Sequence, residues 1–197
     1  MCKGSLEIVA VSCAVDVLEI KTVTISKVAS DKYYVSILVE DDKELPNKPK
    51  LERENAIGID LGLKDFAIMS DGDRISNPKY LKKSEKQLAR KERQLSRKKK
   101  GSNNRNKQRK IVAKLHEKIA NQRKDFLHKS SSKIVHKNHG TICMEDLNVK
   151  GMIKNHRLAK SISDVGWGMF YSFLKYKCEW NGKNFLDIGR FEPSSKM

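Results

Sequence analysis

The chain has 197 residues, of which 38% are hydrophobic and 33% are charged. Its 41 Lys and Arg residues outnumber its 24 Asp and Glu residues, which gives a formal net charge of +17. No apolar run approaches the roughly 18 residues that a membrane span needs, and the apolar fraction is sufficient for a folded core. These figures disfavour a membrane protein, a collagen-like chain and a wholly disordered tail. They favour a soluble partner of a polyanion.

The N-terminal part of the chain predicts a β-hairpin followed by a boundary. From Leu18 to Glu40, apolar residues recur at every second position, and Ala29-Ser30-Asp31 supplies a turn. The polar segment Asp41–Glu54 follows and contains Pro46 and Pro49, which break regular structure. We therefore expect a small β unit to be separated from the rest of the chain.

Short apolar runs predict the elements that precede and follow the basic segment. Ala56–Asp60 and Phe66–Met69 are short apolar strands, and a turn at residues 70–73 leads toward Ile75. The next expected elements are a strand at Thr141–Met144, a helix from Asp164, its predicted cap, to about Asn181, and a last strand at Phe185–Phe191. One face of that helix is apolar, and its members are Trp167, Phe170, Leu174 and Cys178.

The whole charge surplus lies between Lys79 and Lys133. This stretch of 55 residues holds 21 Lys and Arg but four acids, while the remainder of the chain is neutral. Its composition is helical, and a break at residues 100–104 predicts two antiparallel helices. Because their apolar stripe is narrow, we expect the pair to lie on a polyanion rather than in a core. A solvated face or disordered arm is the ordinary explanation of such a stretch, but the neutral flanks favour nucleic acid.

The nucleic-acid contacts that we predict are the most clustered cations of this stretch. They are Arg93, Arg97, Lys98, Lys99, Lys100, Arg105, Arg109, Arg123 and Lys124. The five histidines form no metal-ligand pattern, and we interpret them as surface residues or as neighbours of phosphate. Trp167 could stack on a base, but its apolar helix face favours core packing.

Two acids end apolar strands and carry the candidate chemistry. Asp60 stands in Gly58-Ile59-Asp60-Leu61-Gly62, and Glu145 follows Ile142-Cys143-Met144. Neighbouring strands of one sheet could bring the two carboxylates together, where a hard divalent ion such as Mg²⁺ would offset their repulsion. The structural alternative is a turn residue and a cap. An ATPase of the actin and sugar-kinase type also contains G-x-D-x-G, but it needs further glycine-rich loops that this sequence lacks.

Taken together, these motifs resemble the TnpB, or OrfB, proteins encoded by insertion sequences. The similarity extends over about residues 18–197, and residues 1–17 do not resemble the family. The segments that carry it are Lys21–Lys27, Gly58–Ala67, Gln94–Ser102, Lys114–His128, Met144–Met152, Asn155–Trp167 and Arg190–Lys196.

This resemblance implies a metal-dependent, RNA-guided DNA endonuclease, historically described as a transposase. The implied fold class is α/β (α+β). A RuvC-like nuclease domain of the RNase H type is expected at residues 55–197, with a basic helical insertion at about 79–138. Residues 18–54 would be part of a β-barrel domain and a linker. Asp60 and Glu145 are the implied catalytic acids and Mg²⁺ ligands, and guide RNA and target DNA are the implied partners.

The sequence departs from the family after Pro193-Ser194-Ser195-Lys196. Family members continue there with a four-cysteine zinc ribbon and a third catalytic aspartate, and these 197 residues contain neither. We therefore expect a fragment that is truncated at both ends, with no zinc and a weak Mg²⁺ site. Neither Asp164 nor Asp187 is expected to replace the third acid. A nucleic-acid-binding remnant without catalysis is the alternative for this chain.

The cysteines indicate the compartment. None of the four belongs to a C-x-x-C pair, and we interpret them as reduced thiols of a bacterial cytoplasmic protein: Cys2, Cys13, Cys143 and Cys178. The short apolar segment at residues 8–15 is bracketed by Glu7 and Asp16, so we do not expect a signal peptide. The sequence does not indicate an oligomeric state.

Overall fold

The computed structural model describes residues 19–41 and 43–189. The chain divides into two compact units between Glu44 and Leu45. This division lies within the polar segment Asp41–Glu54, where the sequence predicts a boundary. The unmatched segment 1–17 and the end of the predicted last strand, residues 190 and 191, lie outside the described residues.

The described part of the first unit contains the predicted β-hairpin. Strands β1 (Glu19–Lys27) and β2 (Tyr33–Glu40) pair antiparallel, with Ile25 opposite Val35. The turn places Asp31 at a φ of 75°, a left-handed conformation that Asp tolerates better than most residues. The hairpin is confirmed, but both strands are exposed along their whole length, so the alternating apolar residues bury neither face. A β-barrel around this hairpin stays a prediction.

The second unit is built on a five-stranded mixed sheet. Its strands are β3 (Ala56–Leu61), β4 (Asp65–Met69), β5 (Arg74–Ser76), β6 (Thr141–Glu145) and β7 (Asn184–Ile188). Their order across the sheet is β5-β4-β3-β6-β7. The first three strands form an antiparallel meander, whereas β6 and β7 run parallel to β3. Parallel neighbours need long crossover connections, and helices supply them here.

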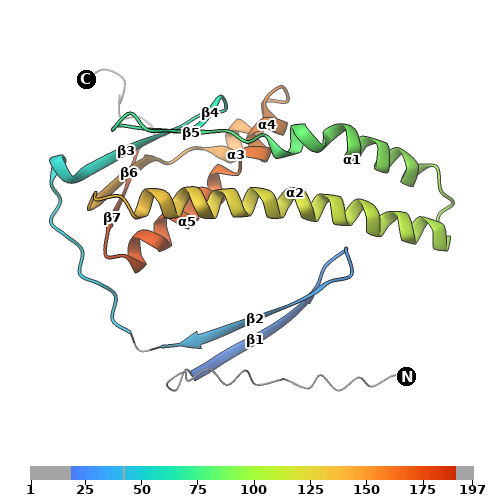
Figure 1. Cartoon of the computed structure of the whole chain (residues 1–197), viewed down its shortest axis with the longest axis horizontal. Coiled ribbons are helices and arrows are strands. Elements are labelled where there is room, and N and C mark those ends of the chain that lie inside the picture. The colour runs from blue at the N-terminus through green and yellow to red at the C-terminus, as the bar shows by residue number, and fades with distance from the viewer. Residues whose placement is uncertain (1–18, 42, 190–197) are drawn as a thin grey trace. The chain divides into compact units, whose positions relative to one another are not determined.

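The basic segment forms the predicted helical pair. Helix α1 (Tyr80–Ser96) and helix α2 (Asn103–Val135) run antiparallel and are joined by a short loop (Figure 1). The hydroxyl of Ser102 caps α2 by accepting a hydrogen bond from the Arg105 amide at 3.2 Å. Between β6 and β7 lie α3 (Val149–Met152), α4 (Ala159–Val165) and α5 (Trp167–Trp180).

The core lies between the sheet and the helices α2 and α5. Phe66 of β4 packs edge-to-face on Phe126 of α2 and on Phe170 of α5, with centroids 5.0 and 4.8 Å apart. Leu127 and Ile134 of α2 are 0% and 1% exposed in the same cluster. The prediction that the helical pair stays out of a core is therefore wrong for the second half of α2. The buried apolar face of α2 is wider in this half, because this part of the helix packs on the sheet.

The predicted apolar face of the last helix is confirmed, but its predicted start is wrong. Trp167, Phe170, Leu174 and Cys178 are all buried. The helix begins at Trp167, after Gly166 takes a φ of 76°, and no side chain caps it. Asp164 lies in the last turn of α4 instead, and its carboxylate accepts a hydrogen bond from the amide of Leu81 at 3.1 Å. The aspartate therefore caps α1, which is 83 residues earlier in the chain.

No helix among the described residues is long and apolar enough to cross a membrane.

Candidate active site and basic surface

The register of the sheet brings the two predicted acids to the same edge. Strands β3 and β6 pair in parallel, with Gly58 opposite Cys143 and Ile59 opposite Met144. Asp60 and Glu145 are the next residues on the two strands. Because both strands end at this level, the two carboxylates lie on neighbouring strands at one edge of the sheet.

Both acids also belong to the same face of the sheet. Ile59 and Met144 are buried at 5% and 1% exposure, and they face the core. Side chains alternate between the two faces of a strand, so the next residue on each strand faces away from the core. Asp60 and Glu145 are accordingly exposed. We call these two residues the acid pair.

The acid pair fits a divalent metal only in part. Mg²⁺ is commonly bound by one or two carboxylates, and substrate phosphates and water complete its coordination. Asp60 and Glu145 provide such a pair of hard oxygen ligands. Among the described residues, however, no group of three or more His, Cys, Asp or Glu side chains could hold a metal ion. The two carboxylates alone would leave substrate oxygens and water to complete the coordination of a metal.

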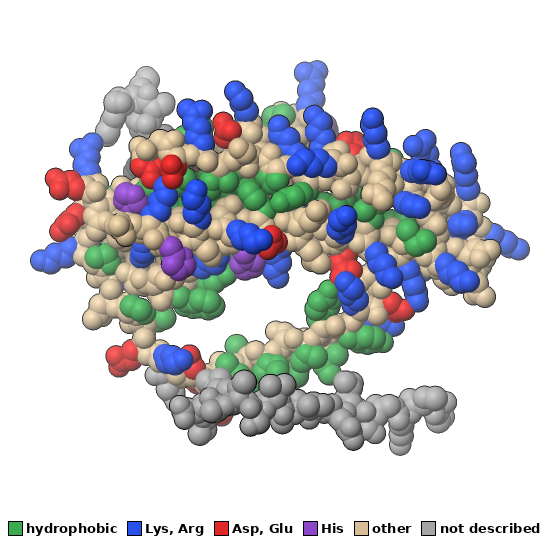
Figure 2. Space-filling model, in the orientation of Figure 1, with side chains coloured by type: hydrophobic (Ala, Val, Ile, Leu, Met, Phe, Trp, Pro, Cys, Tyr) green, Lys and Arg blue, Asp and Glu red, His purple; other side chains and the backbone are tan. Residues whose placement is uncertain are grey.

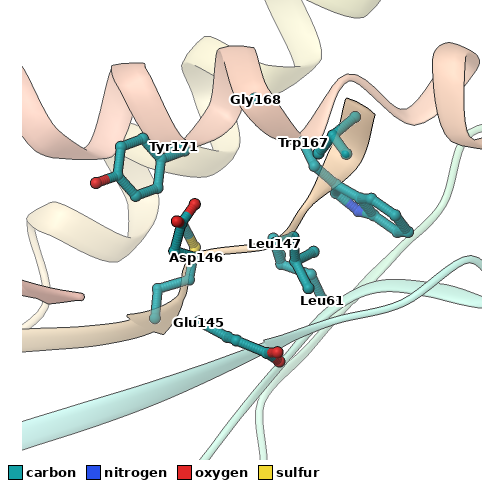
Figure 3. Close-up of a pocket in the computed structure, with 9 residues that line it drawn as sticks. Leu61, Glu145, Asp146, Leu147, Trp167, Gly168 and Tyr171 are labelled. Atoms are coloured by element: carbon teal, nitrogen blue, oxygen red, sulfur yellow. The ribbon is translucent and has the colours of Figure 1, made fainter. Parts of the chain in front are cut away.

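A small pocket adjoins Glu145. It has a volume of about 100 Å³, and Asp146, Trp167 and Tyr171 are among the residues that line it. Figure 3 shows the Asp146 carboxylate directed toward Tyr171, while the Glu145 side chain extends the opposite way. Burial and a hydrogen bond with Asp187 raise the pKa of Tyr171 to about 12. Sequence analysis missed Asp146 and Tyr171, although Asp146 directly follows the predicted acid.

Asp187 and Asp164, which we do not expect to replace a third catalytic acid, lie away from the acid pair. Asp187 of β7 stands opposite Met144, on the face that α5 covers, where it interacts with Tyr171. Asp164 forms an ion pair with Arg123, with Nη2 and Oδ1 2.9 Å apart. Neither aspartate joins the acid pair.

Lys and Arg side chains cover the helical pair. Figure 2 shows them projecting along α1, α2 and the loop between them, with few acids interspersed. We call the exposed cations of α1, α2 and residues 97–102 the basic surface. Six of the nine predicted contacts are exposed there, and they are Arg93, Arg97, Lys99, Lys100, Arg109 and Lys124. Lys98 is half-buried in the loop.

The remaining two predicted contacts have structural partners. Arg105 donates hydrogen bonds to the carbonyls of Leu95 and Lys98, both at 3.0 Å, and so closes the loop. Arg123 donates from Nε to the Asp164 carbonyl at 2.6 Å, in addition to the ion pair. The sequence carried a signal for Arg123, because it lies four residues from both Ile119 and Leu127 and therefore shares their buried face.

The five histidines are exposed or half-buried, on helix α2 or in the loops. His128 stacks on Phe173 of α5 with centroids 3.8 Å apart, and burial lowers its pKa. His116 lies 3.4 Å from the carboxylate of Glu92. Trp167 is 3% exposed within the core, which confirms its packing role over base stacking.

Comparisons with known proteins give a consistent result. Residues 34–156 match the model of the OrfB family of insertion sequences, described as "Probable transposase". A Streptomyces pristinaespiralis protein is 41% identical over 176 residues, and the Escherichia coli protein InsQ is 37% identical over 184 residues. Both are named "putative RNA-guided DNA endonuclease".

The matched regions cover most of this chain but less than half of each relative. They include 89% and 86% of the chain, against 42% and 44% of the two relatives. Among solved structures, the cryo-EM structure of a CRISPR-Cas12f ternary complex aligns with 86% of this chain and 35% of its own. The sequence identity is 18% and the TM-score is 0.48, which is a weak likeness.

Proposed function

Because the chain belongs to the OrfB (TnpB) family of probable transposases, we propose that it carries part of an RNA-guided DNA endonuclease. In this proposal, α1 and α2 bind guide RNA and target DNA, and the acid pair belongs to a RuvC-like site of the RNase H type. The register that aligns Ile59 with Met144 is the observation that carries the proposal, since it places both acids at one edge of the sheet.

The strand arrangement supports the RuvC-like assignment. A three-stranded antiparallel meander continues into two parallel strands, and the acids lie on the central strand β3 and its parallel neighbour β6. The carboxyl ends of parallel strands in open sheets are the usual location of ligand sites. Asp60 and Glu145 are exposed at these ends of β3 and β6.

Each residue has a defined role in the proposed mechanism. Asp60 and Glu145 would hold Mg²⁺, which supplies charge to stabilise the attacking and leaving oxygens of a phosphodiester. The basic surface would neutralise backbone phosphates and so position the strand without recognising its bases. The half-buried Leu61, next to Asp60, packs against the core on the opposite face of β3 and so helps to fix the end of that strand.

The first test is binding. The purified chain should bind single-stranded RNA and DNA, and its affinity should fall steeply as salt concentration rises, because binding releases counterions. Fluorescence anisotropy with labelled oligonucleotides between low and moderate salt measures this dependence. Affinity that does not change with salt would contradict a role for the basic surface.

The second test separates a nuclease from a binding remnant. Labelled RNA–DNA hybrids are incubated with the unmodified chain and with Asp60→Asn in Mg²⁺ or Mn²⁺. Cleavage that disappears in Asp60→Asn would establish an active site. Intact substrate with both proteins would instead support a nucleic-acid-binding remnant without hydrolysis.

A further inference from the structure

A second pocket, lined by three lysines, lies apart from the acid pair. It has a volume of about 330 Å³, and its lining is formed by Leu63, Lys64, Asn77, Lys79, Lys82, Ser161 and Asp164. These residues come from the β3–β4 turn, the segment before α1, the first turn of α1, and α4. Three lysines against one aspartate leave the lining with an excess of two positive charges.

None of the three lysines is paired with a carboxylate at salt-bridge distance in the described part of the chain. Lys160 already pairs with Glu85 and lowers the pKa of that carboxyl, although Lys82 lies near enough to contribute to the shift. The only carboxylate of the lining, Asp164, is occupied by Arg123 at 2.9 Å and by the Leu81 amide at 3.1 Å. Its charge is therefore already offset, and the ammonium groups are available to an external anion.

The wall of the pocket is fixed by hydrogen bonds. The Asn77 side chain donates from Nδ2 to the Leu63 carbonyl at 2.9 Å, which ties the β3–β4 turn to the segment before α1. The same side chain accepts from the Lys79 amide at 3.1 Å through Oδ1. Lys79 is held at a φ of 50°, a conformation that non-glycine residues rarely adopt. The lysine backbones are thus positioned before any ligand arrives.

In the sequence, the three lysines of the pocket lie between Asp60 of the acid pair and the first helix of the basic surface, or at the start of that helix. Lys79 and Lys82 stand at the start of α1, where the basic surface begins. Lys64 lies in the turn that directly follows the strand of Asp60. The lining lysines therefore belong to the segments that join the strand of Asp60 to the first basic helix, and to the start of that helix.

We propose that Lys64, Lys79 and Lys82 form a binding site for a backbone phosphate of the nucleic acid. The inference rests on the proposed function, since the phosphate belongs to the strand that the basic surface binds. Lysine is a point charge with rotatable donors, so three of them around one pocket suit a phosphate of variable orientation. Free phosphate has the same chemistry, and the experiment distinguishes the two sources.

Lysine footprinting tests the site in the unmodified chain. The chain is acetylated briefly with an amine-reactive ester, alone and with an oligonucleotide, and the modified lysines are quantified by mass spectrometry. The oligonucleotide should lower modification of Lys64, Lys79 and Lys82 at least fivefold. The exposed lysines Lys48, Lys50 and Lys154 are the internal controls and should change less than twofold.

Two further ligands identify the source of the phosphate. An uncharged methylphosphonate oligonucleotide of the same sequence should give no protection, and inorganic phosphate at the same phosphate concentration should give little. Equal protection by inorganic phosphate would overturn the backbone assignment. Binding of the oligonucleotide without protection would overturn the pocket alone, whereas a complete lack of binding would overturn the proposed function together with it.

A matched pair of variants gives an independent measure. The combined variant Lys64→Gln, Lys79→Gln, Lys82→Gln should bind the oligonucleotide about tenfold more weakly and with a smaller salt slope. Lys48→Gln, Lys50→Gln, Lys154→Gln removes the same charge elsewhere and should lose less than threefold. Circular dichroism confirms that both variants fold. Equal losses in the two variants would show that the pocket contributes only general charge.

Discussion

The sheet core and the helical arm bury their apolar residues to different degrees. We call the sheet, the second half of α2, and α5 the sheet core. The outer part of the helical pair, which packs around Leu88, Val112, Leu115 and Ile119, is the helical arm. Eleven buried hydrophobic residues described in the sheet core are at most 1% exposed, whereas the four buried residues of the arm are 3% to 9% exposed. A narrow apolar seam leaves most of each arm helix free to carry cations.

Helix α2 belongs to both regions and shows where the change occurs. Its 33 residues begin in the arm and end between the sheet and α5. Arg123 and Lys124 lie near the transition. The first is half-buried against Asp164, and the second is exposed. Adjacent residues of the same charge therefore have different roles, because the helix turns about 100° between them.

The largest effect is expected from a cavity in the sheet core. Phe170→Ala removes a 0% exposed ring that packs on Phe66, and it should cost about 3–5 kcal/mol of unfolding free energy. Urea unfolding followed by circular dichroism measures the change. Met169→Ala, at a 43% exposed neighbour, should change stability by roughly 0.5 kcal/mol or less. Similar losses in the two variants would contradict the assigned core.

A cavity in the helical arm should cost less and act locally. Leu115→Ala should lower stability by about 2 kcal/mol, at the low end for such substitutions, because the residue is already 9% exposed. Hydrogen exchange should quicken in α1 and the first half of α2 but not in β3 or β6. Ile111→Ala, at 45% exposure, is the control. Equal acceleration in the sheet would show that the two regions unfold as one.

Replacing the neighbouring cations Arg123 and Lys124 one at a time separates an effect on stability from an effect on binding. Arg123→Gln should cost about 1.5 kcal/mol, because the Asp164 carboxylate and carbonyl lose their donor. Lys124→Gln should leave stability unchanged and weaken oligonucleotide binding. Thermal unfolding and fluorescence anisotropy on both variants provide the two measurements. The reverse pattern would place Arg123 on the binding surface.

The smallest expected effect concerns how the free energy of unfolding falls as the pH is lowered into the acid range. Lys137 of the loop after α2 contacts Asp71 and Asp73, at 2.5 Å each, and its hydrogen bond lowers the pKa of Asp71. The unfolded chain therefore takes up this proton at higher pH than the folded chain. The contribution of Asp71 is complete above an ordinary Asp pKa of about 4 and is lost as pH falls through the lower folded value.

Asp71→Asn should accordingly flatten this part of the profile. The variant lacks the titrating carboxylate, so its stability should decline less below about pH 4 than that of the unmodified chain. Urea unfolding at a series of pH values from neutral to acidic measures how steeply the free energy of unfolding falls with pH. Asp65→Asn, on the same strand meander, provides a control for removing one carboxylate. Parallel profiles for Asp71→Asn and the unmodified chain would contradict the ion pair.

Local patterns predicted most elements of the fold. Alternating or short apolar runs located β1 to β4 and β6, and charge density with a polar break located α1 and α2. The buried face of α5 followed from a period of 3.6 residues, which needs no knowledge of the partner. The prediction that Asp164 caps the last helix is wrong, because its carboxylate accepts from the Leu81 amide at the start of α1, a contact that no local pattern specifies.

The sequence by itself determined where the charge lies, that Asp60 and Glu145 follow apolar strands, and that the chain resembles the OrfB family. These are local properties that neighbouring residues encode. Only the tertiary structure decided that the two acids share a face and an edge, that Arg123 pairs with Asp164, and that three lysines line one pocket with Ser161 and Asp164. The reason is that strand register and helix packing join residues far apart in the chain, and no local pattern specifies them.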